Sequence, residues 1–168
     1  MTGRLNNKTA IIVGAGQTAG DTIGNGRAMA MRFAREGATV LCADRNIDSA
    51  NETVARIEAL GGKALAHEVD VTDTAQCAAL ASAANDQLGR IDILVNNVGV
   101  GSGDAPPHAI EEEAWDRIMA INLKSMAMTI RHVLPVMRQQ KSGAILNISS
   151  LAAIAGHHMV TYEVSKMG

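Results

Sequence analysis

The chain has 168 residues, with 15 Lys and Arg against 17 Asp and Glu, so its formal net charge is −2. This length is typical of one domain, and 47% hydrophobic residues can supply its core. No run of Lys and Arg gathers on one segment, which argues against binding of nucleic acid or a membrane surface and favours a small-molecule partner.

The cysteines and the apolar stretches bear on the cellular compartment. Cys42 and Cys77 are too few for a disulfide framework and lack a CxxC spacing, so we expect both to be free and buried. No apolar stretch approaches the roughly 18 residues that a membrane-spanning helix needs. A cytoplasmic protein without a membrane segment is therefore expected.

The first third of the chain predicts a βαβ unit. Residues 9–13 form a short β-branched run that leads into a glycine-rich turn, which is typical of a strand before a helix. A helical pattern over about 24–36 ends at Gly37, a residue suited to a left-handed C-terminal cap. Residues 38–43 then predict a second strand.

The rest of the chain continues the alternation. An apolar stripe predicts a helix over 48–60, and Asp73 begins a capping-box pattern for a helix that stops at Gly89. Further strands are expected at 64–69, 91–95 and 144–148, with one long helix over about 112–139. The pattern predicts an α/β fold of the Rossmann type, a doubly wound parallel sheet of about five strands with helices on both faces. Without repeats or linkers, residues 1–168 are expected to form one domain.

The glycine-rich turn is a candidate phosphate site. Glycines let backbone N–H groups approach a pyrophosphate at a helix N-terminus, where the helix dipole favours negative charge. Such a turn alone is weak evidence, because an ordinary flexible turn has the same composition. Its place between a predicted strand and a predicted helix favours dinucleotide binding.

Asp44 ends the second predicted strand, where a carboxylate can accept hydrogen bonds from the adenosine ribose hydroxyls. The same charge repels a 2′-phosphate, so it favours NAD over NADP. An acid at a strand end is also common in ordinary turns. The neighbouring Arg45 points the other way, because a guanidinium can accommodate a 2′-phosphate.

Tyr162 and Lys166 are four residues apart, so in a helix they share one face. The ammonium then favours the phenolate form of the tyrosine, as a general acid/base requires. The alternative is a pair on the surface of a helix.

Six motifs follow one another along the chain. They are the glycine-rich turn, Asp70-Val71 after the third strand, Asn96-Asn97-Val98-Gly99 after the fourth, Asn122 in the long helix, Ser149-Ser150 after the fifth, and Tyr162-x-x-x-Lys166. Their combination and order resemble the classical short-chain dehydrogenases/reductases over essentially the whole chain.

The resemblance implies a catalytic group. Tyr162 would be the acid/base, and Ser150, twelve residues before it, would hydrogen-bond the substrate oxygen. Lys166 would hold the nicotinamide ribose and favour the phenolate of Tyr162. Asn122 would bind a water that links Lys166 to solvent.

The resemblance also implies the cofactor contacts. Asp70 and Val71 would flank the adenine, Asn96 would stabilise the geometry of the central strand and the cofactor site, and Gly99 would let the cofactor lie close. Tyr162 and Lys166 would contact it as well.

The first turn departs from the family pattern. Ten residues separate Gly14 from Gly24, about six more than usual, and the extra ones fall at roughly 17–22. The preferred alignment makes Gly14, Gly24 and Gly26 the phosphate-site glycines, and the alternative uses Gly14-x-Gly16-x-x-Ala19. We hypothesise that the polar side chains of the inserted loop add contacts to the cofactor.

The chain also stops two residues after Lys166, where family members continue for some 80 residues. A piece of a longer enzyme, with a homodimer or homotetramer as its full-length form, is therefore expected. His157 and His158 are candidate substrate contacts or an exposed loop pair.

The motifs predict hydride transfer between NAD(H) and a secondary alcohol or ketone. A 3-oxoacyl-carrier-protein reductase is the alternative within the class, and Asp44 argues against its usual NADPH. A non-catalytic dinucleotide-binding fragment or interaction protein is the alternative outside it.

Overall fold

The computed structural model describes residues 3–18, 20–156 and 158–168, so the expectations for Ala19 and His157 lie outside the described residues. Five parallel strands form one sheet in the order β3-β2-β1-β4-β5. Their bounds are β1 Thr9–Val13, β2 Thr39–Asp44, β3 Lys63–Glu68, β4 Ile93–Asn96 and β5 Ala144–Asn147. The predicted α/β fold is confirmed, and each predicted strand is present to within two residues.

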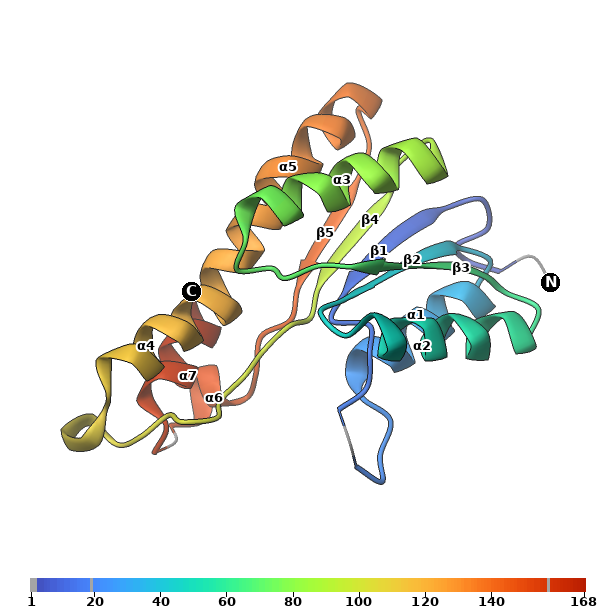
Figure 1. Ribbon diagram of the computed structural model, residues 1–168. Coiled ribbons are helices and arrows are strands. Elements are labelled where there is room, and N and C mark those ends of the chain that lie inside the picture. The colour runs from blue at the N-terminus through green and yellow to red at the C-terminus, as the bar shows by residue number, and fades with distance from the viewer. Residues whose placement is uncertain (1–2, 19, 157) are drawn as a thin grey trace.

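Helices cover both faces of the sheet (Figure 1). One face carries α1 (Asn25–Arg35) and α2 (Ile47–Ala59), and the other carries α3 (Thr74–Leu88) and α5 (Ser125–Gln140). Asp73 accepts hydrogen bonds from the N–H groups of Ala75 and Gln76, as the capping pattern predicts.

Strand periodicity divides the core into two layers. Ile11 and Val13 of β1 pack with α3 and α5, whereas Ala10 and Ile12 pack with α1 and α2. Cys42 and Cys77 are free and buried, as expected, and burial raises the pKa of the Cys42 thiol to about 12.

The long helix expected over 112–139 is confirmed, and it contains one local irregularity. The α-helix α4 (Glu112–Met119) passes into a π-helical turn, η2 (Ala120–Lys124), before α5 begins. The chain is therefore helical without a break from 112 to 140, and apolar spacing does not reveal the local change from i→i−4 to wider hydrogen bonding within it.

Short elements complete the fold near the end of the chain: η1 (Pro107–Ala109), α6 (Ala152–Ala155) and α7 (Val160–Met167). In Figure 1, α4, α6 and α7 lie together beyond the carboxyl ends of the strands. Within the described ranges, no helix has the length and apolar character needed to cross a lipid bilayer.

Candidate active site

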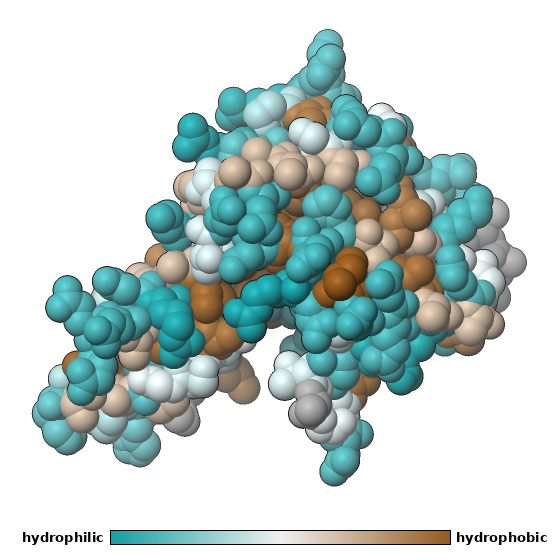
Figure 2. All heavy atoms as spheres, viewed as in Figure 1, coloured by the Kyte–Doolittle hydropathy of each residue, from teal (hydrophilic) through white to brown (hydrophobic). Residues whose placement is uncertain are grey.

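A cavity of about 870 Å³ lies at the carboxyl edge of the sheet. Figure 2 shows the surface hollowed between the α4–α7 region and the loop after β1. The cavity is lined by ten of the predicted site residues, namely Gly14, Gly24, Gly26, Asp44, Asp70, Val71, Gly99, Ser150, Tyr162 and Lys166. Of the described residues predicted for the site, Asn96, Asn122 and the candidate substrate contact His158 do not line it.

Two glycines let the first turn fold tightly. Gly14 has φ +80°, in the region that favours glycine, and a Cβ added to Gly26 would lie 1.8 Å from the Gly14 carbonyl oxygen. Helix α1 begins at Asn25, with Gly24 as its N-cap. This start agrees with the alignment that places Gly24 and Gly26 at the opening of the helix.

The Gln17 side chain closes the inserted loop on itself. Its Oε1 accepts the Gly24 N–H at 2.7 Å, and its Nε2 donates to the carbonyls of Thr18 and Thr22 at 2.7 and 2.9 Å. Gln17 and Thr18 line the cavity, whereas Thr22 is not among the described lining residues. The Gln17 amide therefore organises the loop, and contact of the loop with a cofactor stays a hypothesis.

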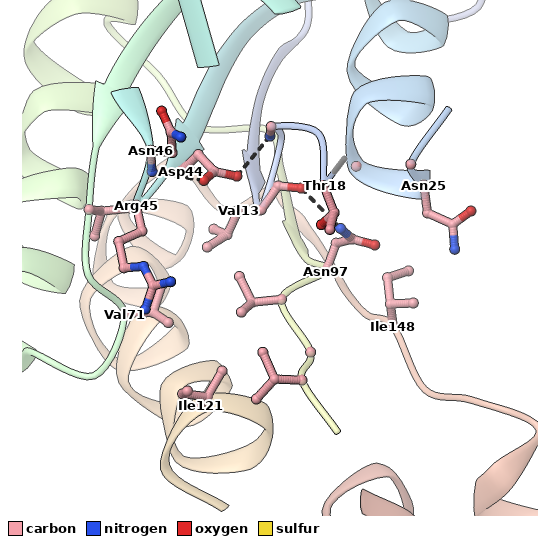
Figure 3. Close-up of a pocket in the computed structure, with 18 of the residues that line it drawn as sticks. Val13, Thr18, Asn25, Asp44, Arg45, Asn46, Val71, Asn97, Ile121 and Ile148 are labelled. Carbon is pink, nitrogen blue, oxygen red and sulfur yellow. Dashed lines mark hydrogen bonds between the residues drawn. The ribbon is translucent and has the colours of Figure 1, made fainter. Parts of the chain in front are cut away.

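Asp44 joins the end of β2 to the first turn. Its Oδ2 accepts the Gly16 N–H at 2.8 Å and its Oδ1 accepts the Asn46 N–H at 3.0 Å (Figure 3). A Cβ on Gly16 would lie 2.7 Å from this carboxylate, which explains why Gly16, the glycine of the alternative alignment, has no side chain. Ser49 was not predicted, yet it lines the cavity and its Oγ accepts the Gln17 N–H at 2.7 Å.

Asp70 also lines the cavity, in a polar turn that follows β3. The hydroxyl and N–H of Thr72 donate to its carboxylate and lower its pKa, and the charge of Arg45 adds to this effect. Figure 3 shows the Arg45 side chain beside Val71. Arg45, whose guanidinium could accommodate the 2′-phosphate of NADP, thus lies in the same cavity as Asp44.

The two adjacent asparagines at the end of β4 face different surroundings. Asn96 is 3% exposed; its amide donates to the Asn147 oxygen at 2.9 Å and accepts from the Thr129 hydroxyl at 2.8 Å. This placement suits a role in strand geometry rather than direct contact. Asn97, which was not singled out, lines the cavity and donates to the Gly14 carbonyl at 3.0 Å (Figure 3). The alternation of side chains along a strand could have distinguished them.

Tyr162 and Lys166 share one face of α7, with the Lys166 Nζ 5.9 Å from the centroid of the tyrosine ring. The ammonium donates to the carbonyls of Val98 at 3.3 Å and Ile148 at 3.0 Å. Burial lowers the pKa of Lys166, since desolvation disfavours its charged form. A Cβ on Gly99 would lie 2.8 Å from this nitrogen, which accounts for a glycine there.

Asn122 is fully buried in the π-helical turn, behind the cavity wall. Its Oδ1 accepts the Val100 N–H at 2.8 Å, and its Nδ2 donates to the Val100 carbonyl and the Ser165 hydroxyl, both at 2.9 Å. The amide therefore ties the loop after β4 to α7. Its implied role in binding a water stays a prediction.

The two serines after β5 both line the cavity but have different partners. The Ser149 hydroxyl donates to the Lys166 carbonyl at 2.6 Å, at the C-terminal end of α7. The Ser150 hydroxyl accepts the Ala152 N–H at 3.2 Å, which leaves its proton for another acceptor. Ser150 is thus the better placed of the two to donate toward the cavity.

Comparisons with known proteins agree with this geometry. A family model described as short chain dehydrogenase matches residues 8–168. The 3-oxoacyl-[acyl-carrier-protein] reductase FabG of Thermotoga maritima is 36% identical over 98% of this chain. A short-chain dehydrogenase/reductase structure from Burkholderia xenovorans has a TM-score of 0.94 and 42% identity, covering 99% of this chain and 66% of its own.

Solved relatives also carry dinucleotides. A 7α-hydroxysteroid dehydrogenase complexed with NADH and 7-oxo glycochenodeoxycholic acid has a TM-score of 0.89 and 39% identity, covering 98% of this chain and 62% of its own. A metagenomic relative, with a TM-score of 0.89 and 34% identity, is described in complex with NADP. The chain spans 65% of the length of the Thermotoga relative and 61% of that of an Escherichia coli 7α-hydroxysteroid dehydrogenase.

Proposed function

Because the chain belongs to the short chain dehydrogenase family, we propose that it transfers a hydride between NAD(H) and a secondary alcohol or ketone. The observation that carries the proposal is that Tyr162, Lys166 and Ser150 line one cavity with the glycine-rich first turn. This proximity of a tyrosine, a lysine and a serine to a glycine-rich helix N-terminus supports proton transfer beside a bound dinucleotide.

The residues present fit a nicotinamide dinucleotide. A Cβ added to Gly26 would lie 1.8 Å from the Gly14 carbonyl oxygen, so these two glycines let the first turn pack against the start of α1, where the positive end of the helix dipole favours a pyrophosphate. Asp44 and Asp70 would hold the adenosine end, and Lys166 the nicotinamide ribose. When bound, the cofactor supplies or accepts the hydride.

The chain's own residues handle the proton. In the oxidative direction, the Tyr162 phenolate takes the proton of the substrate hydroxyl while Ser150 donates to the same oxygen. Lys166 has three N–H donors and uses two on backbone carbonyls, so one remains for the ribose or the tyrosine oxygen. In the reductive direction, Tyr162 returns the proton to the oxygen.

We propose NAD rather than NADP as the cofactor. The Asp44 carboxylate lines the cavity at the end of β2, where it would repel a 2′-phosphate. Arg45 lies in the same cavity, where its charge helps to lower the pKa of the Asp70 carboxyl. Relatives occur with either cofactor.

Reduction of a 3-oxoacyl thioester is the second candidate, favoured by the 36% identity to the Thermotoga reductase. It predicts turnover of an acyl-carrier substrate with NADPH, whereas the first candidate predicts turnover of free alcohols or ketones with NAD(H). Assays of both substrate classes with both cofactors separate them.

We also propose that the full-length protein is a homodimer or homotetramer and that it is cytoplasmic. The free, buried cysteines suit a reducing compartment. Self-association is supported by large apolar side chains exposed on and beside α6 and α7, namely Leu151, Ile154, Val164 and Met167.

The decisive test is Tyr162→Phe, which removes one hydroxyl and keeps the ring. We expect turnover to fall by about 10²-fold or more, with binding of NADH unchanged, because the ring packing is preserved and only proton transfer is lost. Absorbance of reduced nicotinamide measures turnover, and calorimetry measures binding.

Retention of full turnover by Tyr162→Phe would refute the assigned role. If the unaltered protein binds NADH yet turns over no alcohol, ketone or thioester, the non-catalytic dinucleotide-binding alternative is correct instead.

A further inference from the structure

Asp104, in the loop between β4 and α4, reaches across to the start of α7. Its Oδ2 accepts the Tyr162 N–H at 2.7 Å, and its Oδ1 accepts the N–H groups of Thr161 at 3.2 Å and Ala105 at 2.9 Å. Tyr162 is 58 residues further along the chain. A half-buried carboxylate thus binds the backbone of the proposed acid/base itself.

Helix α7 needs this partner, because its first N–H groups have no acceptor within the helix. Its N-cap residue, Met159, makes no side-chain capping bond. Asp104 takes the place of a local N-cap and puts negative charge at the positive end of the helix. Partial burial raises the pKa of Asp104, but the bonds from Tyr162 and Thr161 outweigh burial, so the pKa lies below its usual value.

The loop that carries Asp104 is itself anchored. Asn122 bonds both the N–H and the carbonyl of Val100. The Arg117 guanidinium donates to the Ser102 carbonyl. Between these anchors, Gly101 lies against the ring of Tyr162, where an added Cβ would be 3.4 Å from a ring carbon. The aspartate therefore caps α7 from a fixed position.

We propose that Asp104 is a positioning residue that holds Tyr162 in register with Lys166 and Ser150. Helix α7 is held at its N-terminal end by Asp104 and in its last turn by the Asn122–Ser165 bond and by the bond from Ser149 to the Lys166 carbonyl. Loss of the first tie frees the turn that carries Tyr162, so the phenol leaves its productive orientation more often. The catalytic consequence rests on the proposed function; the structural tie does not.

The single tyrosine of the chain makes the tie directly measurable. Labelling with ¹⁵N-tyrosine gives one backbone amide signal, from the N–H that donates to Asp104. In Asp104→Ala we expect this amide to exchange with solvent about tenfold faster, as loss of one hydrogen bond to a charged group implies. Asp104→Asn retains one acceptor oxygen and should give an intermediate rate.

Asp116→Ala is the matched control, because Asp116 is exposed on α4 and lies outside the loop. It should leave the Tyr162 amide unchanged. An Asp104→Ala amide that exchanges as slowly as the unaltered one would overturn the proposal, and Asp104→Asn decides the question if the alanine variant does not fold.

Kinetics test the catalytic consequence in the full-length protein. We expect kcat to fall about tenfold in Asp104→Ala, with partial recovery in Asp104→Asn and with the KM for NAD unchanged. Faster amide exchange with unaltered kcat would refute the positioning role. An unaltered protein without activity would refute the proposed function, while the exchange measurement would still decide whether Asp104 holds α7.

Discussion

Lys166 is an ionisable residue whose side chain is buried. Its side chain is 7% exposed, and its ammonium has two backbone carbonyls as acceptors but no carboxylate among the ion pairs of the described residues. The cost of desolvation lowers its pKa below the ordinary value of 10.5. A buried amine close to a phenol is suited to proton transfer, and it also makes folding depend on pH.

Replacement of Lys166 by Met should expose this dependence. Between the lowered pKa of the folded protein and about 10.5, the unfolded chain binds more protons at Lys166 than the folded protein does. The stability of the unaltered protein relative to Lys166→Met should therefore rise as pH rises through that window, and be independent of pH below it. Urea unfolding at a series of pH values measures the difference.

Lys124→Met is the control, since Lys124 is exposed on the π-helical turn. Its stability should differ from that of the unaltered protein by an amount that does not change over the same range. A Lys166→Met curve that stays parallel to the unaltered curve would contradict the argument.

The segment between β1 and α1 shows how a polar loop is organised at the scale of an element. One side-chain amide, that of Gln17, bonds three backbone groups of the loop. The neighbouring backbone is tied to α2, because the Thr53 hydroxyl donates to the Ala15 carbonyl at 2.8 Å and accepts from the buried Arg27 guanidinium at 2.9 Å. The loop therefore presents a preformed wall to the cavity.

Gln17→Ala should weaken NADH binding severalfold while leaving the unfolding temperature almost unchanged. The variant loses three hydrogen bonds within the loop, so the loop must be ordered each time NADH binds, and this lowers the affinity. The core is not altered, so the unfolding temperature changes little. Calorimetric titration and thermal unfolding measure the two effects. Gln139→Ala, on the exposed side of α5, is the control, and equal NADH affinity in the two variants would contradict the role of Gln17.

At the scale of the whole molecule, the sheet order places β1 beside both β2 and β4. From β1 the chain continues to β2 on one side, and it later returns to β4 on the other side. The loops that follow β1 and β4 therefore diverge and open a crevice at the carboxyl ends of these strands. The cavity lies there, and it joins residues as remote as Gly14 and Lys166.

Ligand binding should consequently stabilise the fold as a unit. NADH at about 100 times its dissociation constant is expected to add roughly 2.7 kcal/mol to the free energy of unfolding. NADPH at the same concentration should add less, because Asp44 repels its additional phosphate. Thermal unfolding with each cofactor measures this, and Asp44→Asn should narrow the difference. Equal or greater stabilisation by NADPH would contradict the NAD preference.

Periodicity and turn chemistry determined the five parallel strands, their approximate bounds and the helices on both faces, because these depend on which side chains can be buried along each segment. The same local signals identified Gly14, Asp44, Tyr162 and Lys166, which stand at the ends of strands or in one turn of helix. They did not reveal the π-helical turn around Asn122 or the different surroundings of Asn96 and Asn97.

The tertiary structure alone decided the contacts that hold the site. The Tyr162 N–H donates to Asp104, and the Ser149 hydroxyl donates to the Lys166 carbonyl. Neither partner of these two hydrogen bonds can be recognised from the local sequence of the other. A sequence pattern reports what each segment prefers locally, whereas the partners of its polar groups depend on how separate segments pack. Ten of the residues that line the cavity were thus predictable from the motifs along the chain, whereas Ser49 and Asn97 and the hydrogen bonds that orient the site came only from packing.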